Sequence, residues 1–220
     1  RWEIVQGSAS TVSIVNDVFY GGSGKSAYLA DDSSQTISQM QFSAGRPMPQ
    51  FYFSGYFRFR EVTGSHFVLC GSGNSQLIYF VNAAYASGGG VWRYYDGNQY
   101  RRFPGDAKGF VAGTWYKIEV EGDFIRKTFS VWVDGVAVGE NIPIPGGNAS
   151  ITAISLLPAS SSGTGGMWVD GVWFGSTKPT SDPTTSSELS KPDGQGLFSG
   201  PQDFSEMRVY PNPFRPGRGA

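Results

Sequence analysis

Cysteine and histidine are nearly absent from the sequence, which contains one of each, Cys70 and His66, in 220 residues. A structural zinc site takes about four such ligands, and a disulfide takes two cysteines. Ser-His-Asp and Cys-His mechanisms would depend on His66 alone. We therefore expect no zinc site, no internal disulfide and no catalytic role for His66, and we interpret Cys70 as a buried strand residue.

Charge is also scarce, because only 16% of the residues are charged and the 17 basic and 18 acidic side chains leave a net charge of −1. The basic residues form no run of the kind that binds nucleic acid or an anionic membrane surface. No apolar stretch approaches the ~18 residues of a membrane-spanning helix. We expect no nucleic acid partner and no membrane insertion.

Aromatic residues make up 15% of the chain, and 31 residues are glycine. Helical periodicity is nearly absent, whereas alternation of apolar and polar residues recurs between turn-forming residues. Residues 51–60 show this alternation best and predict a strand with one core face and one polar, aromatic face. The core face carries Phe51, Phe53, Gly55, Phe57 and Phe59, and the other carries Tyr52, Ser54, Tyr56, Arg58 and Arg60.

The same pattern predicts seven further strands, over residues 77–81, 91–95, 99–103, 115–121, 127–133, 151–157 and 167–174. Asp96-Gly97-Asn98 predicts a tight hairpin between two of them, and Asp134-Gly135 predicts a turn after Val133. Short strands at this spacing are typical of an all-β, antiparallel β-sandwich.

One five-residue segment, Trp-Val-Asp-Gly-Val, occurs at residues 132–136 and again at 168–172. The flanking sequences are not similar. We interpret the two copies as shared strand-and-turn chemistry and not as a repeat architecture.

The composition changes at Ser176, after which Ser, Thr, Pro, Lys and Gly dominate. We expect a β-sandwich recognition domain over residues 1–175, a linker over 176–206 and an extended, β-competent C-terminal tail over 207–220.

Two motifs resemble a known family. Residues 115–120, Trp-Tyr-Lys-Ile-Glu-Val, with residues 129–135, Phe-Ser-Val-Trp-Val-Asp-Gly, resemble the paired central strands of concanavalin A-like lectin/glucanase domains, which include laminin-G-like modules. Residues 167–174, Met-Trp-Val-Asp-Gly-Val-Trp-Phe, are similar to the closing strand of that family. The resemblance covers roughly residues 1–175 and implies a jelly-roll sandwich.

A separate resemblance lies in the tail. Residues 209–214, Val-Tyr-Pro-Asn-Pro-Phe, resemble the opening of the immunoglobulin-like sorting domains of secreted bacterial surface proteins. This resemblance implies secretion and an extracellular or cell-surface location. We further expect the tail, residues 201–220, to pack along the edge of a sheet. The edge of another subunit's sheet is favoured over that of its own, and such packing would build a homopolymer or filament.

Glucanases of the resembled family carry carboxylates as Glu-x-Asp-x-x-Glu on one strand. The nearest approach is Glu119-Val120-Glu121, which lacks the Asp and the last Glu, and the lone His66 does not supply the His, Tyr and Gln cluster of the family's lyases. We therefore expect no enzymatic activity, and a glycoside hydrolase or lyase is only the third interpretation.

Recognition needs aromatic faces and planar hydrogen-bonding groups, which suit both sugars and protein partners. The candidate ligand-binding residues are Tyr52, Tyr56, Arg58, Trp92, Tyr94, Tyr100 and Arg102. We expect a non-catalytic, secreted recognition module that binds carbohydrate. The alternative is contact with a neighbouring protein subunit, as in a structural subunit of an extracellular assembly, and plain surface packing is a further interpretation of the same side chains.

The resemblance also implies a calcium ion between the beginning of the chain and the last strand. Calcium takes hard oxygen ligands. The candidates are Asp17, Asp31, Asp32 and Asp170. Their alternative interpretation is a turn for Asp31 and Asp32 and a strand-end hydrogen bond for Asp170.

Overall fold

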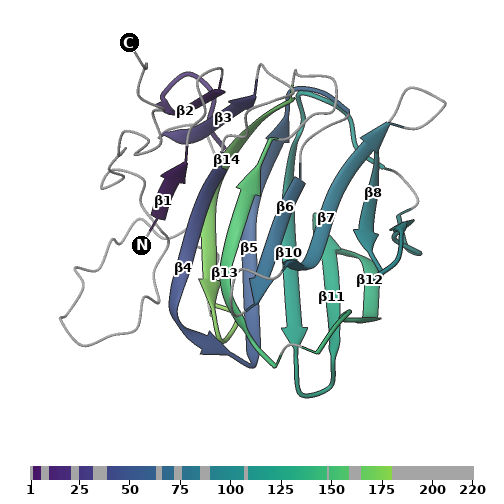
Figure 1. Ribbon diagram of the computed structural model, residues 1–220. Coiled ribbons are helices and arrows are strands. Elements are labelled where there is room, and N and C mark those ends of the chain that lie inside the picture. The colour runs from purple at the N-terminus through teal and green to yellow at the C-terminus, as the bar shows by residue number, and fades with distance from the viewer. Residues whose placement is uncertain are drawn as a thin grey trace, which may run out of the picture.

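The computed structural model describes residues 2–5, 10–20, 25–31, 39–62, 66–71, 76–84, 90–106, 109–147, 149–158 and 165–179. Within these residues every regular element is a β-strand, and two seven-stranded sheets pack face to face (Figure 1). All pairings between the named strands are antiparallel. The predicted all-β, antiparallel β-sandwich is confirmed.

Sheet A has the strand order β1-β4-β13-β6-β7-β8-β9. Its strands are β1 (Trp2–Val5), β4 (Gln39–Met48), β13 (Ile151–Leu157), β6 (His66–Gly71), β7 (Gln76–Ala84), β8 (Gly90–Tyr95) and β9 (Tyr100–Arg102). Sheet B has the order β12-β11-β10-β5-β14-β3-β2. Its strands are β12 (Val136–Pro143), β11 (Thr128–Val133), β10 (Trp115–Asp123), β5 (Gln50–Phe59), β14 (Gly165–Gly175), β3 (Ser26–Asp31) and β2 (Ser10–Val15).

The core lies between the sheets, and β5 contributes a row of phenylalanines to it. Phe51, Phe53, Phe57 and Phe59 are each no more than 3% exposed, as the alternation of residues 51–60 predicts. Burying a phenylalanine side chain is worth ~1.5–3 kcal/mol, so this row fixes which face of sheet B points inward. The opposite face, called the outer face of sheet B below, carries the alternate residues.

All eight strands predicted from alternation correspond to strands of the structure, namely β5, β7, β8, β9, β10, β11, β13 and β14. The predicted turns are also present. Asp134 and Gly135 both have positive φ, 50° and 75°, as a two-residue turn between β11 and β12 requires. In the other hairpin, Asp96 Oδ1 accepts hydrogen bonds from the backbone N–H groups of Asn98 and Gln99.

The repeated five-residue segment takes two different conformations. At residues 132–136 it forms the turn described above, whereas at 168–172 it continues through β14 as a bulge, where the register with β5 shifts between Asp170 and Trp173. Gly171 supplies a φ of 53° at the bulge. Val169 and Val172 are consequently both fully buried although they are three residues apart. The copies share strand chemistry, but the turn is present only in the first.

None of the described residues belongs to a helix long and apolar enough to cross a membrane. The predicted linker from residue 180 onward and the tail at 207–220 lie outside the described residues.

Candidate functional site

The predicted ligand residues of β5 lie on the outer face of sheet B, but two of them are covered. Tyr52 is 2% exposed and Tyr56 is 5% exposed, while Arg58 is partly exposed. The strand is central in its sheet, so side chains from both neighbouring strands and from flanking segments lie over it. The rings of Tyr52 and Tyr56 are therefore not open ligand surfaces.

The predicted role of Trp92 and Tyr94 as ligand-binding residues does not agree with the structure, since both side chains point into the sandwich. Trp92 is 1% exposed, and its ring lies 4.7 Å from that of Phe110 and 5.6 Å from that of Phe59. Tyr94 is half-buried, with its ring centroid 4.9 Å from that of Phe103. Both faces of β8 carry aromatic residues, and the face with Trp92 is the one that packs against sheet B. The prediction that these two residues form a ligand face is wrong.

Tyr100 and Arg102 lie on β9, at the edge of sheet A. Tyr100 is 48% exposed, and its ring centroid lies 5.4 Å from that of Tyr95. Arg102 Nε lies 3.2 Å from Oδ2 of the buried Asp106, which also accepts a hydrogen bond from the backbone N–H of Trp92. Arg102 thus has a structural partner, and the predicted residues do not form one surface.

The outer face of sheet B instead carries a row of aromatic residues around Arg58. Trp115 of β10 pairs with Arg58, Arg58 pairs with Trp168 of β14, and Trp168 pairs with Tyr28 of β3. All four side chains are partly exposed. Trp115, Trp168 and Tyr28 are absent from the predicted site, although Trp115 and Trp168 lie within the predicted strands on the faces opposite the core.

Contacts within this row are close. The guanidinium carbon of Arg58 lies 5.2 Å from the ring centroid of Trp168, a cation–π distance. The rings of Tyr28 and Trp168 are 4.8 Å apart, and Arg60 Nη1 donates a hydrogen bond of 3.2 Å to the hydroxyl of Tyr28.

Tyr20, which follows β2, completes the surface. Its ring stacks on that of Tyr56 at 3.7 Å and meets the edge of Trp115 at 6.1 Å. We call this set the aromatic–arginine patch; it consists of Tyr20, Tyr28, Tyr56, Arg58, Arg60, Trp115 and Trp168.

Asp170 fixes the position of Tyr20. Its Oδ2 accepts a 3.0 Å hydrogen bond from the backbone N–H of Tyr20, and its Oδ1 accepts one of 2.7 Å from that of Gly171. Burial raises the pKa of Asp170, and these two hydrogen bonds offset part of the rise. Asp170 therefore joins the segment after β2 to β14.

Glu119, on the same outer face, is a buried carboxylate with three partners. Its Oε1 accepts a 2.5 Å hydrogen bond from the hydroxyl of Tyr52 and lies 3.0 Å from Lys178 Nζ and 3.9 Å from Lys117 Nζ. Burial opposes ionisation, but the bonds from Tyr52 and Lys178 and the charges of both lysines lower the pKa of Glu119 overall. Burial and the Glu119 charge raise the pKa of Tyr52 well above its usual value. Lys178 also lies 5.5 Å above the Tyr52 ring.

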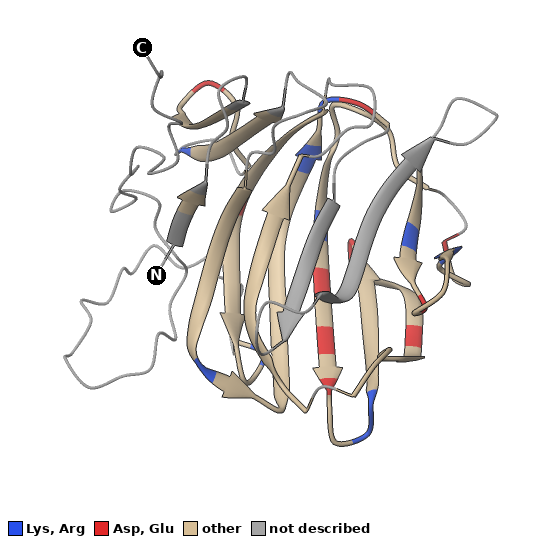
Figure 2. Cartoon of the chain, in the orientation of Figure 1, with Lys and Arg blue, Asp and Glu red and all other residues tan. Residues whose placement is uncertain are grey.

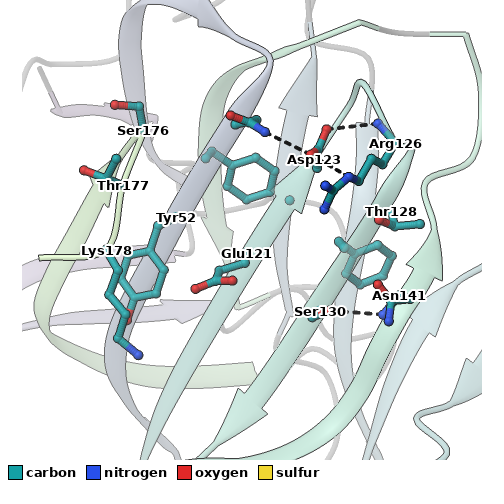
Figure 3. Close-up of a pocket in the computed structure, with 14 residues that line it drawn as sticks. Tyr52, Glu121, Asp123, Arg126, Thr128, Ser130, Asn141, Ser176, Thr177 and Lys178 are labelled. Atoms are coloured by element: carbon teal, nitrogen blue, oxygen red, sulfur yellow. Dashed lines mark hydrogen bonds and ion pairs between the residues drawn. The ribbon is translucent and has the colours of Figure 1, made fainter.

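Next to this cluster is a shallow pocket of about 360 Å³, which we call the polar groove (Figure 3). Figure 3 shows Tyr52, Ser176, Thr177 and Lys178 on one side, Arg126, Thr128 and Asn141 on the other, and Glu121 between them. The groove is lined by Gln50, Phe51, Tyr52, Glu121, Gly122, Asp123, Arg126, Thr128, Phe129, Ser130, Asn141, Ser176, Thr177 and Lys178. Its lining is rich in hydroxyl, amide and carboxylate groups.

The polar groove and the aromatic–arginine patch lie along the same pair of strands. Tyr52 pairs with Glu121 at the groove, and Arg58 pairs with Trp115 at the patch. Between them, Tyr56 pairs with Lys117. The two surfaces are therefore successive parts of one face.

The predicted glycosidase candidates differ in their surroundings. Glu119 is 6% exposed and ion-paired, whereas Glu121 is exposed. A general acid at neutral pH needs a raised pKa, and that of Glu119 is lowered. The arrangement is that of a structural carboxylate.

The calcium candidates are placed as follows. Asp17 is exposed between β2 and β3, the Asp31 side chain and all of Asp32 lie outside the described part, and Asp170 accepts two backbone hydrogen bonds. The described residues contain no group of three or more His, Cys, Asp and Glu placed to hold a metal ion. Calcium binding stays a prediction.

His66 and Cys70 both lie in β6, so Cys70 is a strand residue, as the sequence predicts. The side chains of both residues are outside the described part of the structure.

The sequence matches no protein-family model and no curated protein. Solved structures with the same architecture include a sialidase, with a TM-score of 0.63 and 15% identity over 81% of this chain. The globular domain of T. cruzi calreticulin matches with a TM-score of 0.54 and 8% identity, covering 80% of this chain and 85% of that one. Alginate lyase AlyC3 matches with a TM-score of 0.51 and 9% identity, covering 76% and 90%. The chain spans 17% of the length of the sialidase. At these identities the likenesses establish a shared β-sandwich fold.

Proposed function

We propose that this β-sandwich is a non-catalytic carbohydrate-binding module whose ligand lies on the outer face of sheet B. The observation that carries the proposal is the row Trp115, Arg58, Trp168 and Tyr28, partly exposed across four strands and continued by the polar groove. Aromatic faces pack against the C–H faces of sugar rings, and amides, hydroxyls and carboxylates bind sugar hydroxyls.

The two parts of the face have complementary roles in this proposal. Trp115 and Trp168 flank Arg58 and offer indole surface for stacking. The polar groove offers Glu121, Asn141 and Ser130 as hydrogen-bonding groups. Its volume of about 360 Å³ lies within the ~300–1,000 Å³ range of small-molecule sites, so the groove accommodates a sugar unit beyond those that stack on the patch.

The surroundings of Glu119 favour binding over hydrolysis. The carboxylate is neutralised by Lys178 and hydrogen-bonded by Tyr52. Asp123, two residues beyond Glu121, has the Glu-x-Asp spacing of the glucanase motif, but its carboxylate accepts hydrogen bonds from the Gln50 side chain and from the backbone N–H groups of Ile125 and Arg126.

Membership of the concanavalin A-like group and secretion to the cell surface are part of the same proposal, and they rest on the sequence resemblances. The alternative of a filament subunit depends on residues 201–220, which lie outside the described residues.

The test compares Trp115→Ala and Trp168→Ala with Tyr100→Ala, which removes an exposed ring from the edge of the other sheet. Binding is screened on an array of neutral and acidic glycans and quantified by calorimetry. We expect each tryptophan variant to lose about 1–3 kcal/mol of binding free energy, or ~5–150-fold in affinity, and Tyr100→Ala to bind like the wild type.

Circular dichroism melting checks that the variants fold. A wild-type protein that binds no glycan, or folded tryptophan variants with unchanged affinity, would contradict the proposal.

A further inference from the structure

Arg58 has an unusual environment for an arginine in a folded protein. Its Nε is buried and has no hydrogen-bond partner among the described residues. Its neighbours across the sheet on both sides are tryptophans, Trp115 and Trp168, which supply ring surface but no acceptor oxygen. Buried donors are nearly always satisfied in native proteins, so an unsatisfied one calls for a partner.

Other arginines on the surface of the sandwich have such partners. Arg101 is ion-paired with Asp96, and Arg102 is ion-paired with Asp106. Arg60, directly after β5, meets Glu61 at 3.5 Å and the hydroxyl of Tyr28 at 3.2 Å. No ion pair joins Arg58 to a carboxylate of the described residues, which distinguishes it from these three.

Asp170 is the carboxylate of the outer face that lies nearest to Arg58 in the strand register, because it pairs with Tyr56, two residues along β5. Both of its oxygens accept backbone hydrogen bonds, from Tyr20 and Gly171. The carboxylate is therefore committed to holding Tyr20 in place and is not the partner that Arg58 lacks.

The charges along the face are also segregated. Figure 2 shows the acidic residues of β10 gathered toward the end that leads into β11. These are Glu119, Glu121 and Asp123, which pair with Ser54, Tyr52 and Gln50 of β5. Arg58 and Arg60 lie toward the opposite end of the face, where they attract an anion to the aromatic–arginine patch. At the groove, the carboxylates of Glu119 and Asp123 are paired with Lys178 and Arg126.

We propose that Arg58 binds the carboxylate of an acidic sugar whose ring lies against Trp115 and Trp168. This inference rests on the proposed function and specifies its ligand as an anionic glycan. A guanidinium presents a planar fork of donors that matches a carboxylate in a bidentate pair. The contact of Arg58 with Trp168 is a ring-face contact with no directional hydrogen bond to break, so the guanidinium can turn its Nε edge toward a ligand.

The test measures the preference for an acidic glycan over its neutral counterpart with the same backbone. The probe pairs are polygalacturonate with its methyl ester, and sialyllactose with lactose. The wild type should bind the acidic member of at least one pair ten-fold or more tightly than the neutral member. Arg58→Gln should abolish that preference, so that the ratio of the two affinities falls from ten or more to about one.

Two further variants separate recognition from folding. Arg58→Lys keeps the charge but not the fork, and we expect an intermediate preference. Arg93→Gln removes a partly exposed arginine from β8 of the other sheet, and we expect the full preference to remain. Each variant is checked by circular dichroism melting.

If the wild type binds the acidic and neutral members equally, and Trp115→Ala loses this binding, the inference about Arg58 is overturned and the proposed function is kept. An acid preference that persists in folded Arg58→Gln would overturn it as well. Tighter binding of sulfated carrageenan than of either carboxylated probe would show that the anion is a sulfate ester and not a carboxylate. If neither the acidic nor the neutral probes bind, and the glycan array is also negative, the proposed function itself fails.

Discussion

Tyr20 lies flat on Tyr56, with ring centroids 3.7 Å apart and 19° between the ring planes. The contact brings a residue from outside the strands onto the centre of sheet B, and Asp170 holds it there through the Tyr20 N–H. The exposed surface of the aromatic–arginine patch at this point is therefore the ring of Tyr20, which is 38% exposed, and not that of Tyr56.

The first prediction concerns the pH dependence of this link. The pKa of Asp170 is raised in the fold, so the native state holds its proton more tightly than the unfolded chain does. The stability that Asp170 contributes is present below its unfolded pKa of ~3.9 and decreases as the pH rises through the folded pKa. Asp170→Asn removes this titration.

We therefore expect the melting temperature of Asp170→Asn, relative to the wild type, to rise between pH 3 and pH 7. Asp17→Asn, an exposed aspartate in the segment after β2, serves as the control and should follow the wild type. A relative melting temperature of Asp170→Asn that falls over this range would show that the carboxylate is stabilised as the anion.

A second prediction concerns the buried carboxylate under Lys178. Glu119→Gln removes the negative charge that pairs with Lys178 and accepts the hydrogen bond of Tyr52. Removing one partner of such a buried hydrogen-bonded group lowers the free energy of unfolding by ~1–3 kcal/mol. Glu121→Gln, two residues along the same strand face and exposed, should change the free energy of unfolding by less than about 0.5 kcal/mol. Urea denaturation at pH 7 measures both.

The pKa of Glu119 is lowered in the fold, so its contribution to stability is present above the unfolded pKa of ~4.3 and is lost as the pH falls through the folded pKa. The difference between the wild type and Glu119→Gln should accordingly shrink below about pH 4. Equal unfolding free energies for Glu119→Gln and Glu121→Gln at pH 7 would contradict the assigned role.

A third prediction concerns the floor of the polar groove. A Cβ added at Gly122 would lie 2.0 Å from Cε1 of the Phe51 ring, which belongs to the core. Gly122→Ala should destabilise the fold by ~1–3 kcal/mol, as overpacking does. Gly147→Ala, where no atom lies within 4 Å of the added Cβ, is the matched control. Identical urea midpoints for the two variants would mean that Phe51 moves aside freely.

The strands were predictable where alternation was regular and the turns were marked. In β4 and β12 the signal is weak for physical reasons. Residue 47 of β4 is a proline, and Gly45 has a φ of 73°, while Asn141 of β12 has a φ of 52° beside a shift in register. Both strands are irregular and depend on their neighbours, so they lack the local pattern that predicts β5 or β13.

The site was predictable only in part, because alternation separates two faces without saying which one is buried. On β8 the face with Trp92 and Tyr94 and the face with Arg93 and Tyr95 are both aromatic, and only packing against Phe59 and Phe110 decides between them. The row through Arg58 joins strands that are distant in the sequence. It follows from the pairing of β10, β5 and β14, which the sequence pattern does not specify.

The bulge in β14 also has an evolutionary consequence. Val136 and Val172 end the two copies of the same five-residue segment, yet Val136 is 62% exposed and Val172 is fully buried. Selection on folding acts weakly on the first valine and strongly on the second, because only a residue of similar shape fits the second position. Descendants of this gene should therefore diverge at position 136 and keep an aliphatic residue at position 172, so the likeness between the two segments should fade with evolutionary distance.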